Sequence, residues 1–325
     1  MSVTTERDEI VDELRRADKL LLTTHENPDG DALGSLLGMH LVLEQLGKDS
    51  VMFIAANQFP LPYEYQRMPL AAVRHELPDD VETRTLVFVD CGNIDRTPVN
   101  YLQNSGLRVL NIDHHHDNTR FGSVNLVVAD ASCAAEIVYG LAKELGVEIT
   151  PQLAEALYIG LVTDTGKFMF ENTTAESHQM AAELMDAGVE PQNVHRKLYE
   201  ELPYARLQLL ARALNSVHRF DDGALTITHI TREDFASSGA TESDSEGIVD
   251  HMRQVEGTVM AGLVRELIDK EGRKVSLRST DGRVDVSVIA RGLGGGGHKQ
   301  AAGFTTTLPF DELMERLRTE MAAQL

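Results

Sequence analysis

The chain has 325 residues, of which 42% are hydrophobic and 25% charged, proportions typical of a globular protein with room for two domains. The formal net charge of -21 argues against a partner such as long nucleic acid, because that binding depends on Lys and Arg neutralising phosphates. No apolar run is long enough to span a membrane, no signal pattern opens the chain, and two cysteines form no disulfide framework, so we expect a cytoplasmic protein with no membrane partner.

The first half of the chain alternates predicted helices and strands. A helix with Ile10, Val11 and Leu14 on one face opens it. Strands are then predicted near 20–24, 51–56, 85–89, 107–112 and 124–128, and helices near 31–46, 132–145, 151–165 and 175–187. The run at 85–89 is apolar without alternation, as in a strand buried on both faces. This order predicts an α/β fold with a doubly wound parallel sheet over residues 1–190.

A second, smaller α/β domain is predicted over residues 217–325. The helical pattern at 191–216, broken at Pro203, is polar enough to be a linker between the domains. Beyond it we expect a strand at 224–228, a Ser/Thr/Asp/Glu-rich loop at 237–247, strand-like runs at 255–267 and 274–279, an apolar-periodic segment at 284–290 and a C-terminal amphipathic helix.

Metal-ligand side chains follow three of the predicted strands. The turn after the first strand carries His25, Asp29 and Asp31, Asp90 follows the strand at 85–89, and the run from Asp113 to His115 follows the strand at 107–112. Asp-rich turns are also ordinary helix caps, so one such turn does not by itself distinguish a metal site from a cap. The ends of parallel strands meet at one sheet edge, however, and sites of such sheets lie there.

A mixed carboxylate and imidazole set without thiolate suits two Mn²⁺ or Mg²⁺ ions bridged by a carboxylate. Asp164, at the end of the helix near 151–165, is a further candidate ligand. Two ions about 3.5–4 Å apart share a hydroxide and stabilise both oxygens of an in-line displacement at phosphorus. The pattern therefore indicates phosphoester hydrolysis without a protein nucleophile.

A glycine run, Gly294 to Gly297, precedes His298 in the second half of the chain. Flexible turns are the commonest cause of such a run. The alternative is a backbone cradle for phosphate, closed by cationic side chains. Around it, residues 265–299 reverse the overall charge balance, and Arg278, Ser279, Arg291 and Lys299 lie near the run.

Five motifs in order resemble the DHH phosphoesterase family. They are His25-x-x-Pro28-Asp29-x-Asp31, Val89-Asp90, Asp113-His114-His115, Thr163-Asp164-Thr165-Gly166 and Gly294-Gly295-Gly296-Gly297-His298. They span essentially the whole chain and are closest to the nanoRNase and adenosine 3′,5′-bisphosphate (pAp) phosphatase branch, also described as bifunctional oligoribonucleases. The resemblance implies a DHH catalytic domain followed by a DHH-associated substrate-binding domain.

The resemblance also implies roles for individual residues. His25, Asp29 and Asp90 would hold one Mn²⁺, and a second ion would bind Asp31, Asp90, His114 and Asp164, with Asp90 bridging; Mg²⁺ or Co²⁺ could replace Mn²⁺. Asp90, Asp113 and His115 would form the catalytic set, with Asp113 orienting a histidine ligand and His115 facing the scissile phosphate. Substrate contacts would come from Arg278, Ser279, Gly295, Gly296, Gly297 and His298.

Four further residues have a less defined place in the resemblance. His116 matches no family position and is more simply interpreted as a surface group. Ser132 and Glu136 match a family segment, although a capped helix start explains Ser132 equally well, and Cys133 stands where the family usually has a small hydroxyl residue.

The implied activity is Mn²⁺-dependent hydrolysis of short oligoribonucleotides (nanoRNA) to 5′-mononucleotides and of pAp to AMP by attack of a bridging hydroxide. Cyclic di-AMP or a linear dinucleotide is the alternative substrate. An inorganic pyrophosphatase, or a nucleotide sensor without catalysis, fits less well. A homodimer is compatible with the resemblance, but no stretch identifies an interface.

Overall fold

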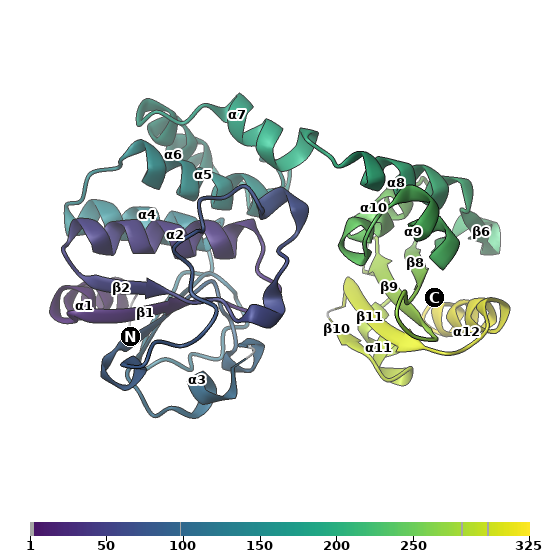
Figure 1. The fold of residues 1–325 in the computed structure, drawn as a ribbon, viewed down its shortest axis with the longest axis horizontal. Helices are drawn as coiled ribbons and strands as arrows, with labels where there is room; N and C mark the ends of the chain where they lie inside the picture. The colour runs from purple at the N-terminus through teal and green to yellow at the C-terminus, as the bar shows by residue number, and fades with distance from the viewer. Residues whose placement is uncertain (1–2, 98, 281, 298) are drawn as a thin grey trace. The chain divides into compact units, whose positions relative to one another are not determined.

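The computed structural model describes residues 3–97, 99–280, 282–297 and 299–325, with the backbone alone at residues 3 and 4. It divides the chain into two units, Met1–Glu201 and Leu202–Leu325, each built around its own sheet (Figure 1). The predicted α/β class with a parallel N-terminal sheet is confirmed. Among the described residues, no helix combines the length and apolarity that a membrane span requires.

Five parallel strands form the sheet of the first unit. They are β1 (Lys19–Thr23), β2 (Asp49–Met52), β3 (Thr85–Val89), β4 (Val109–Asp113) and β5 (Val124–Val127). Their order in the sheet is β2-β1-β3-β4-β5. The chain therefore reverses its direction across the sheet between β1 and β3, and at such a switch point the loops leaving the strands diverge and leave room for a ligand.

The helices of this unit are α1 (Val3–Arg16), α2 (Gly30–Gln45), α3 (Asn100–Asn104), α4 (Ala134–Leu145), α5 (Pro151–Asp164), α6 (Ala175–Asp186) and α7 (Pro191–His195). Short 3-10 turns lie at η1 (Ala56–Gln58), η2 (Tyr63–Tyr65), η3 (Val81–Thr83) and η4 (Ile94–Arg96), and a π-helical turn at η5 (Arg196–Glu200).

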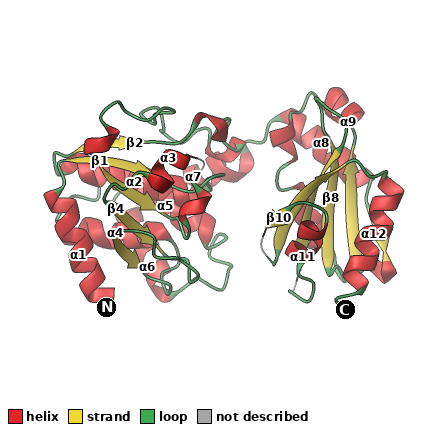
Figure 2. Cartoon of the chain, turned by 90° about the horizontal axis from the view of Figure 1, so that it is seen from below, coloured by secondary structure: helices red, strands yellow, loops and turns green. Residues whose placement is uncertain are grey.

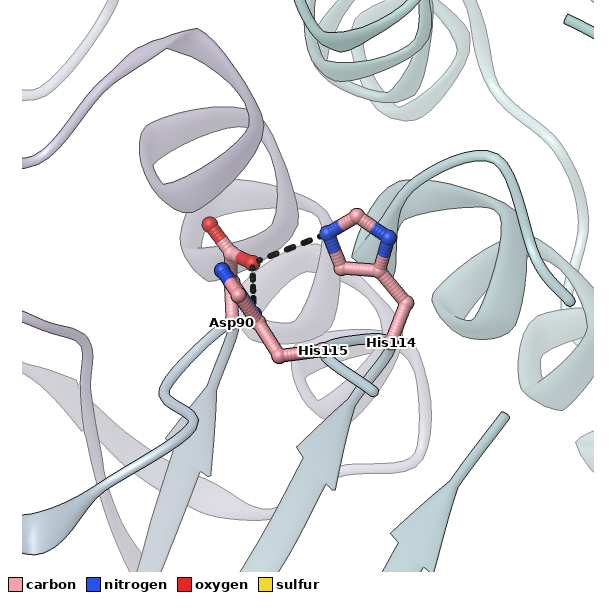
Figure 3. Close-up of side chains that lie close together, drawn as sticks. All are labelled: Asp90, His114 and His115. Carbon is pink, nitrogen blue, oxygen red and sulfur yellow. Dashed lines mark ion pairs between the residues drawn. The ribbon is translucent and has the colours of Figure 1, made fainter. Parts of the chain in front are cut away.

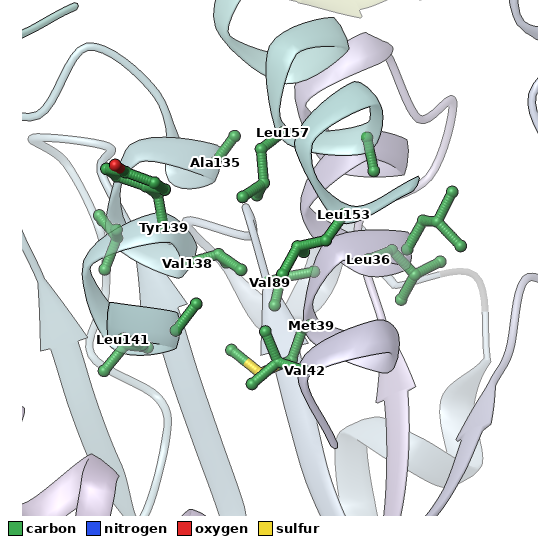
Figure 4. Packing of buried hydrophobic residues seen from close by; sticks show 14 of the residues in the cluster. Leu36, Met39, Val42, Val89, Ala135, Val138, Tyr139, Leu141, Leu153 and Leu157 are labelled. Carbon is green, nitrogen blue, oxygen red and sulfur yellow. The ribbon is translucent and has the colours of Figure 1, made fainter. Parts of the chain in front are cut away.

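Both faces of this sheet are buried. Leu20 and Leu22 of β1 join the large core with α1, α2, α4 and α5, whereas Leu21 between them points to a smaller core on the opposite face. Figure 4 shows α2, α4 and α5 packing their apolar side chains around Val89 of β3. Burial on both faces explains why these strands lack alternation of polar and apolar residues.

Helices α2 and α5 approach each other closely at glycines. A Cβ added to Gly34 would lie 2.5 Å from the Ala156 carbonyl oxygen, and one added to Gly160 would lie 2.8 Å from Asp31 Oδ1. The absence of side chains at these positions lets the two backbones meet. The first turn of α2 and the last turn of α5, which carry Asp31 and Asp164, are thereby brought to the same edge of the sheet.

The second unit contains a mixed sheet with the order β10-β11-β9-β8-β7-β6. Its strands are β6 (His218–Phe220), β7 (Leu225–Ile230), β8 (Met260–Glu266), β9 (Arg273–Ser279), β10 (Gly296–Gly297) and β11 (Ala301–Thr306). Its helices are α8 (Tyr204–Asn215), α9 (Arg232–Ser238), α10 (Ile248–Arg253), α11 (Val286–Gly292) and α12 (Phe310–Ala322), with 3-10 turns η6 (Asp221–Gly223) and η7 (Glu242–Ser245). One core packs α11 and α12 against the sheet, and another packs α8, α9 and α10 against it (Figure 2).

The sequence-based interpretation of this unit was wrong at part of one segment and missed five elements. The stretch 237–247, predicted as a loop, contains the end of α9 and the turn η7, because Gly239 ends one helix and the Thr241–Asp244 capping box begins the next. Strands β6, β10 and β11 and helices α9 and α10 were not predicted. β11 is built from Ala, Gly, Phe and Thr, and its pairing with β9 rather than its composition makes it a strand.

Candidate metal centre

The predicted ligands of the first unit gather at the carboxyl ends of three neighbouring strands. His25 follows β1 by two residues, Asp90 follows β3 directly, and Asp113 is the last residue of β4 and precedes His114. The N-cap of α2 and the end of α5 contribute Asp29, Asp31 and Asp164. The ligand atoms form three groups, each within 4.8 Å: His25, Asp29 and Asp90; Asp31, His114 and Asp164; Asp90, His114 and His115.

Asp90 lies at the centre of this cluster. Its Oδ2 is 3.5 Å from His25 Nε2, and its Oδ1 is 3.5 Å from His114 Nε2 and 3.6 Å from His115 Nδ1 (Figure 3). Among the described residues, this buried Oδ1 makes no hydrogen bond, since the two imidazole nitrogens nearest to it lie 3.5 and 3.6 Å away. A buried carboxylate oxygen without a partner is costly in a protein interior, and a bound cation would satisfy it. The geometry and the chemistry of the donors therefore fit a divalent metal.

Asp31 is held by helix α4. The Ala134 N–H donates to its Oδ2 at 2.6 Å and the Ala135 N–H to its Oδ1 at 2.9 Å, and the Ser35 hydroxyl donates to Oδ1 at 3.1 Å. The first turn of a helix favours a negative charge, so α4 fixes this carboxylate in place. Its Oδ2 lies 3.8 Å from His114 Nε2.

Crowding of acidic groups shifts the pKa values of the cluster. Burial, together with the charges of Asp90 and Asp164, raises the pKa of Asp31 well above its ordinary value. Burial is also the largest influence on Asp164 and raises its pKa to about 6. Burial disfavours the charged form of His114, but the nearby carboxylates of Asp90, Asp31 and Asp164 raise its pKa to about 10. A bound divalent cation would favour charged carboxylates and a neutral imidazole, so it would act against these shifts.

The two predicted histidine ligands are oriented by backbone carbonyls. His25 Nδ1 lies 2.7 Å from the Glu26 carbonyl oxygen, and His114 Nδ1 lies 3.3 Å from that of Ala131. If each Nδ1–H donates to its carbonyl, each Nε2 stays free for a metal. Asp113 Oδ1 lies 2.8 Å from Nδ1 of His115, which belongs to one of the three groups, and the role of Asp113 in orienting a histidine ligand stays a prediction.

Three residues near the cluster were missed by sequence reasoning. Asn118 donates to Asp113 Oδ2 at 2.6 Å, and Asn172 donates to Asp164 Oδ2 at 3.0 Å. The guanidinium of Arg96 lies 3.0 Å from His25 Nδ1. Arg96 follows Asp90 by only six residues in a loop at the same strand end, so its position was a usable signal. Asn118 follows Asp113 by five residues at the end of β4, so the same signal was present there, whereas nothing local marks Asn172.

The weaker candidates of the first unit are Ser132 with Glu136, Cys133 and His116. Ser132 donates from both its hydroxyl and its N–H to Glu136 Oε2, at 2.6 and 2.9 Å, which is a helix-start arrangement. Cys133 is buried. His116 is exposed and belongs to none of the ligand groups found among the described residues.

The predicted substrate contacts of the second unit lie at the end of β9 and around β10. Ser279 Oγ is buried and unpaired among the described residues, and Arg278 Nε lies 3.5 Å from Asp250 Oδ1. A Cβ at Gly295 or Gly297 would come within 2.1 or 2.5 Å of a β11 carbonyl oxygen, so packing against β11 demands glycine there. His298 lies outside the described residues. Contact of this set with a substrate stays a prediction.

Comparison with known proteins places the chain in a family. Residues 19–161 match the N-terminal domain of the DHH family, and residues 225–325 match the DHHA1 domain. The bifunctional oligoribonuclease and PAP phosphatase NrnA of Thermus thermophilus is 37% identical over 316 residues, which cover 94% of this chain and 90% of that protein. The chain belongs to the DHH family. The predicted family and its class, metal-dependent phosphoesterases, are thereby confirmed.

Other relatives extend this DHH assignment. The protein of the same name from Bacillus subtilis is 28% identical over 302 residues, covering 91% of this chain and 92% of that protein. The crystal structure of an exopolyphosphatase-related protein from Bacteroides fragilis shares the fold, with a TM-score of 0.89 and 24% identity over 98% of this chain and 96% of that chain.

Proposed function

We propose that this DHH-family chain is a Mn²⁺-dependent phosphoesterase that hydrolyses short oligoribonucleotides to 5′-mononucleotides and pAp to AMP. The observation that supports it best is the clustering of the six predicted ligands, which include Asp90, whose buried Oδ1 makes no hydrogen bond among the described residues. The names of the Thermus and Bacillus relatives point to the same two activities. The proposed compartment is the cytoplasm.

The proposed mechanism divides the work between bound ions and side chains. Two divalent ions would activate a water and neutralise charge on the phosphate oxygens. His25, Asp29 and Asp90 would hold one ion, and Asp31, Asp90, His114 and Asp164 the other. His115, whose Nδ1 is paired with Asp113, would turn its Nε2 toward the substrate and transfer a proton to the leaving oxygen.

Charge would restrict the substrate length. A chain with a net charge of -21 repels a long polyanion, whereas the positive ions make the catalytic cluster attractive to a single phosphate group. The guanidinium of Arg96 adds positive charge beside His25. In the second unit, Arg278, Ser279, the Gly295–Gly297 run and His298 are the proposed contacts for the remainder of a short substrate.

The test is product release from four substrates with Mn²⁺ and with EDTA: pAp, the linear dinucleotide pApA, cyclic di-AMP and a 20-nucleotide RNA. We expect rapid Mn²⁺-dependent turnover of pAp and pApA, and slow or no turnover of the long RNA. Comparable turnover of cyclic di-AMP would move the proposal to second-messenger breakdown. No turnover of any of the four would overturn it.

A further inference from the structure

Phe170 presents an exposed aromatic ring close to the metal cluster. It is 57% exposed, while the other nine phenylalanines of the chain are buried or partly buried. It follows the candidate ligand Asp164 by six residues. Single exposed apolar side chains are common on protein surfaces, so exposure alone does not indicate that Phe170 binds a ligand.

The loop that carries Phe170 is well held. The N–H groups of Met169 and Phe170 both donate to the Thr165 carbonyl oxygen, at 2.9 and 3.0 Å. Lys167 and Phe168 have positive φ angles of 63° and 64°, a conformation that is costly for residues with side chains. Such backbone is kept where its surroundings enforce it, and it concentrates at functional sites.

The side chains of this loop divide into two kinds. Lys167 Nζ lies 4.2 Å from the ring centre of Tyr199, and the ring of Phe168 stacks on His178 with 4.8 Å between centres. Met169 and Phe170, by contrast, are both exposed. Lys167 and Phe168 thus contact neighbouring aromatic rings, whereas Met169 and Phe170 are presented to solvent.

The ring of Phe170 packs against the backbone of Gly166. A Cβ added to Gly166 would lie 2.5 Å from its Cζ and 2.6 Å from each Cε atom. Two residues beyond the ring, Asn172 donates to both the backbone oxygen and Oδ2 of Asp164. Hydrogen bonds therefore connect the chain on both sides of the ring to the end of α5, and the ring is exposed while it contacts Gly166.

We propose that Phe170 is a nucleobase-binding subsite, on which the base of a nucleotide stacks while its phosphate occupies the metal cluster. The inference rests on the proposed function and adds to it the recognition of the base. Aromatic stacking accepts every base, so it suits an enzyme that degrades short RNA of any sequence. It also adds binding that does not depend on charge, in a chain whose net charge is -21.

The test compares pAp with ribose 3′,5′-bisphosphate, which has the same phosphates but no base, in wild type, Phe170→Leu and Phe170→Tyr. Loss of the ring should raise KM for pAp by about 5- to 100-fold with little change in kcat. KM for the base-free compound should stay the same. Phe170→Tyr keeps an aromatic face and should resemble wild type with both substrates.

Two results would overturn this subsite. One is an unchanged KM for pAp in Phe170→Leu. The other is an equal loss with both substrates, which would mean that the ring only supports Asp164. Failure of the proposed function would look different, because the wild-type protein itself would then turn over neither compound in Mn²⁺.

Discussion

Asp90 combines a strained backbone with a demanding chemical position. Its φ angle is 54°, in the left-handed region where Asp and Asn are tolerated better than most residues with side chains. Its carboxylate faces three histidines and would bridge the two proposed ions. Two requirements thus restrict the residue type at this position: the left-handed backbone of the turn after β3 and the carboxylate needed for the proposed ligand role.

Asp90→Asn and Asp90→Ala separate these two restrictions. Both should lower Mn²⁺-dependent hydrolysis of pAp by more than about 100-fold, because neither supplies a bridging carboxylate. Asn accepts the left-handed backbone, so Asp90→Ala should be less stable than Asp90→Asn by about 1 kcal/mol. Activity assays and urea unfolding measure the two effects. Full metal-dependent turnover in Asp90→Asn would contradict the assignment of Asp90 as a ligand.

Asn172→Ala tests the support of a proposed ligand. Without the donation to Asp164 Oδ2, the carboxylate can rotate away, and the affinity for Mn²⁺ should fall by about 10- to 100-fold. Activity should return at saturating Mn²⁺. The measurement is a Mn²⁺ titration of both activity and binding heat, with the exposed Asn104→Ala as control. An unchanged Mn²⁺ dependence would show that Asn172 does not position Asp164.

At the scale of the elements, the crossing of α2 and α5 decides whether the proposed ligands meet. Gly34 lies where α2 contacts the backbone of α5, while Gly38, one turn further on, contacts only leucine side chains. Side chains can shift to accept a methyl group, whereas helix backbone cannot. The helix contact should therefore tolerate an added methyl group at Gly38 better than one at Gly34.

Gly34→Ala should separate the two helices, lower the free energy of unfolding by about 1–3 kcal/mol and weaken metal binding. Gly38→Ala, the matched control, should cost less, since Leu157 can move and alanine favours a helix more than glycine does. Urea unfolding and a Mn²⁺ titration check both variants. Equal effects of the two substitutions would mean that the helix contact does not organise the cluster.

In the second unit, His229 of β7 stacks on Phe310 at the start of α12, with 4.8 Å between ring centres. Its Nε2 is buried and has no hydrogen-bond partner among the described residues, and burial lowers its pKa below the ordinary 6.5. Arg273 and His218 lower the pKa further, whereas Glu266 and Asp234 act in the opposite direction. Below about pH 6.5 the unfolded chain binds the proton more readily than the folded one, so acid removes stability.

His229→Phe should abolish this contribution and keep the stacked ring. From about pH 7.5 to about pH 5.5, the free energy of unfolding of wild type should fall more steeply than that of the variant. Other titrating groups are common to both proteins and cancel in the difference. Urea unfolding at several pH values measures it, and parallel pH profiles would refute the assignment to His229.

At the scale of the whole molecule, the two units have separate cores, and all the proposed metal ligands lie in the first. Ligand binding stabilises only the part of a protein that folds around the ligand. The acidic cluster, whose Asp31 and Asp164 are held at raised pKa values in the absence of a cation, is the part that should respond to metal.

Thermal unfolding should therefore show a transition of the first unit that moves with metal and another that does not. Mn²⁺ at about 100 times its Kd should add about 2.7 kcal/mol to the first unit alone, and EDTA should reverse it. Calorimetry measures both transitions, and His229→Phe marks the one that belongs to the second unit. A metal-induced shift of that marked transition, or no shift at all, would contradict the location of the site.

The chain order itself determined the parallel sheet and most of the proposed ligands. The apolar run at 85–89 fits a doubly buried strand, and the rule that parallel strands end at one edge then predicted Asp90 beside the His25 turn and Asp113. These inferences succeed because apolar periodicity and turn chemistry are local. They need only a few neighbouring residues.

The tertiary structure decided which groups hold the ligands. The amides of Ala134 and Ala135 reach Asp31 from 103 and 104 residues away, Asn172 donates to Asp164, and Asp113 pairs with His115. Strand β11 exists through its pairing with β9. Such partners depend on how helices and strands pack over long sequence distances, which no local pattern encodes.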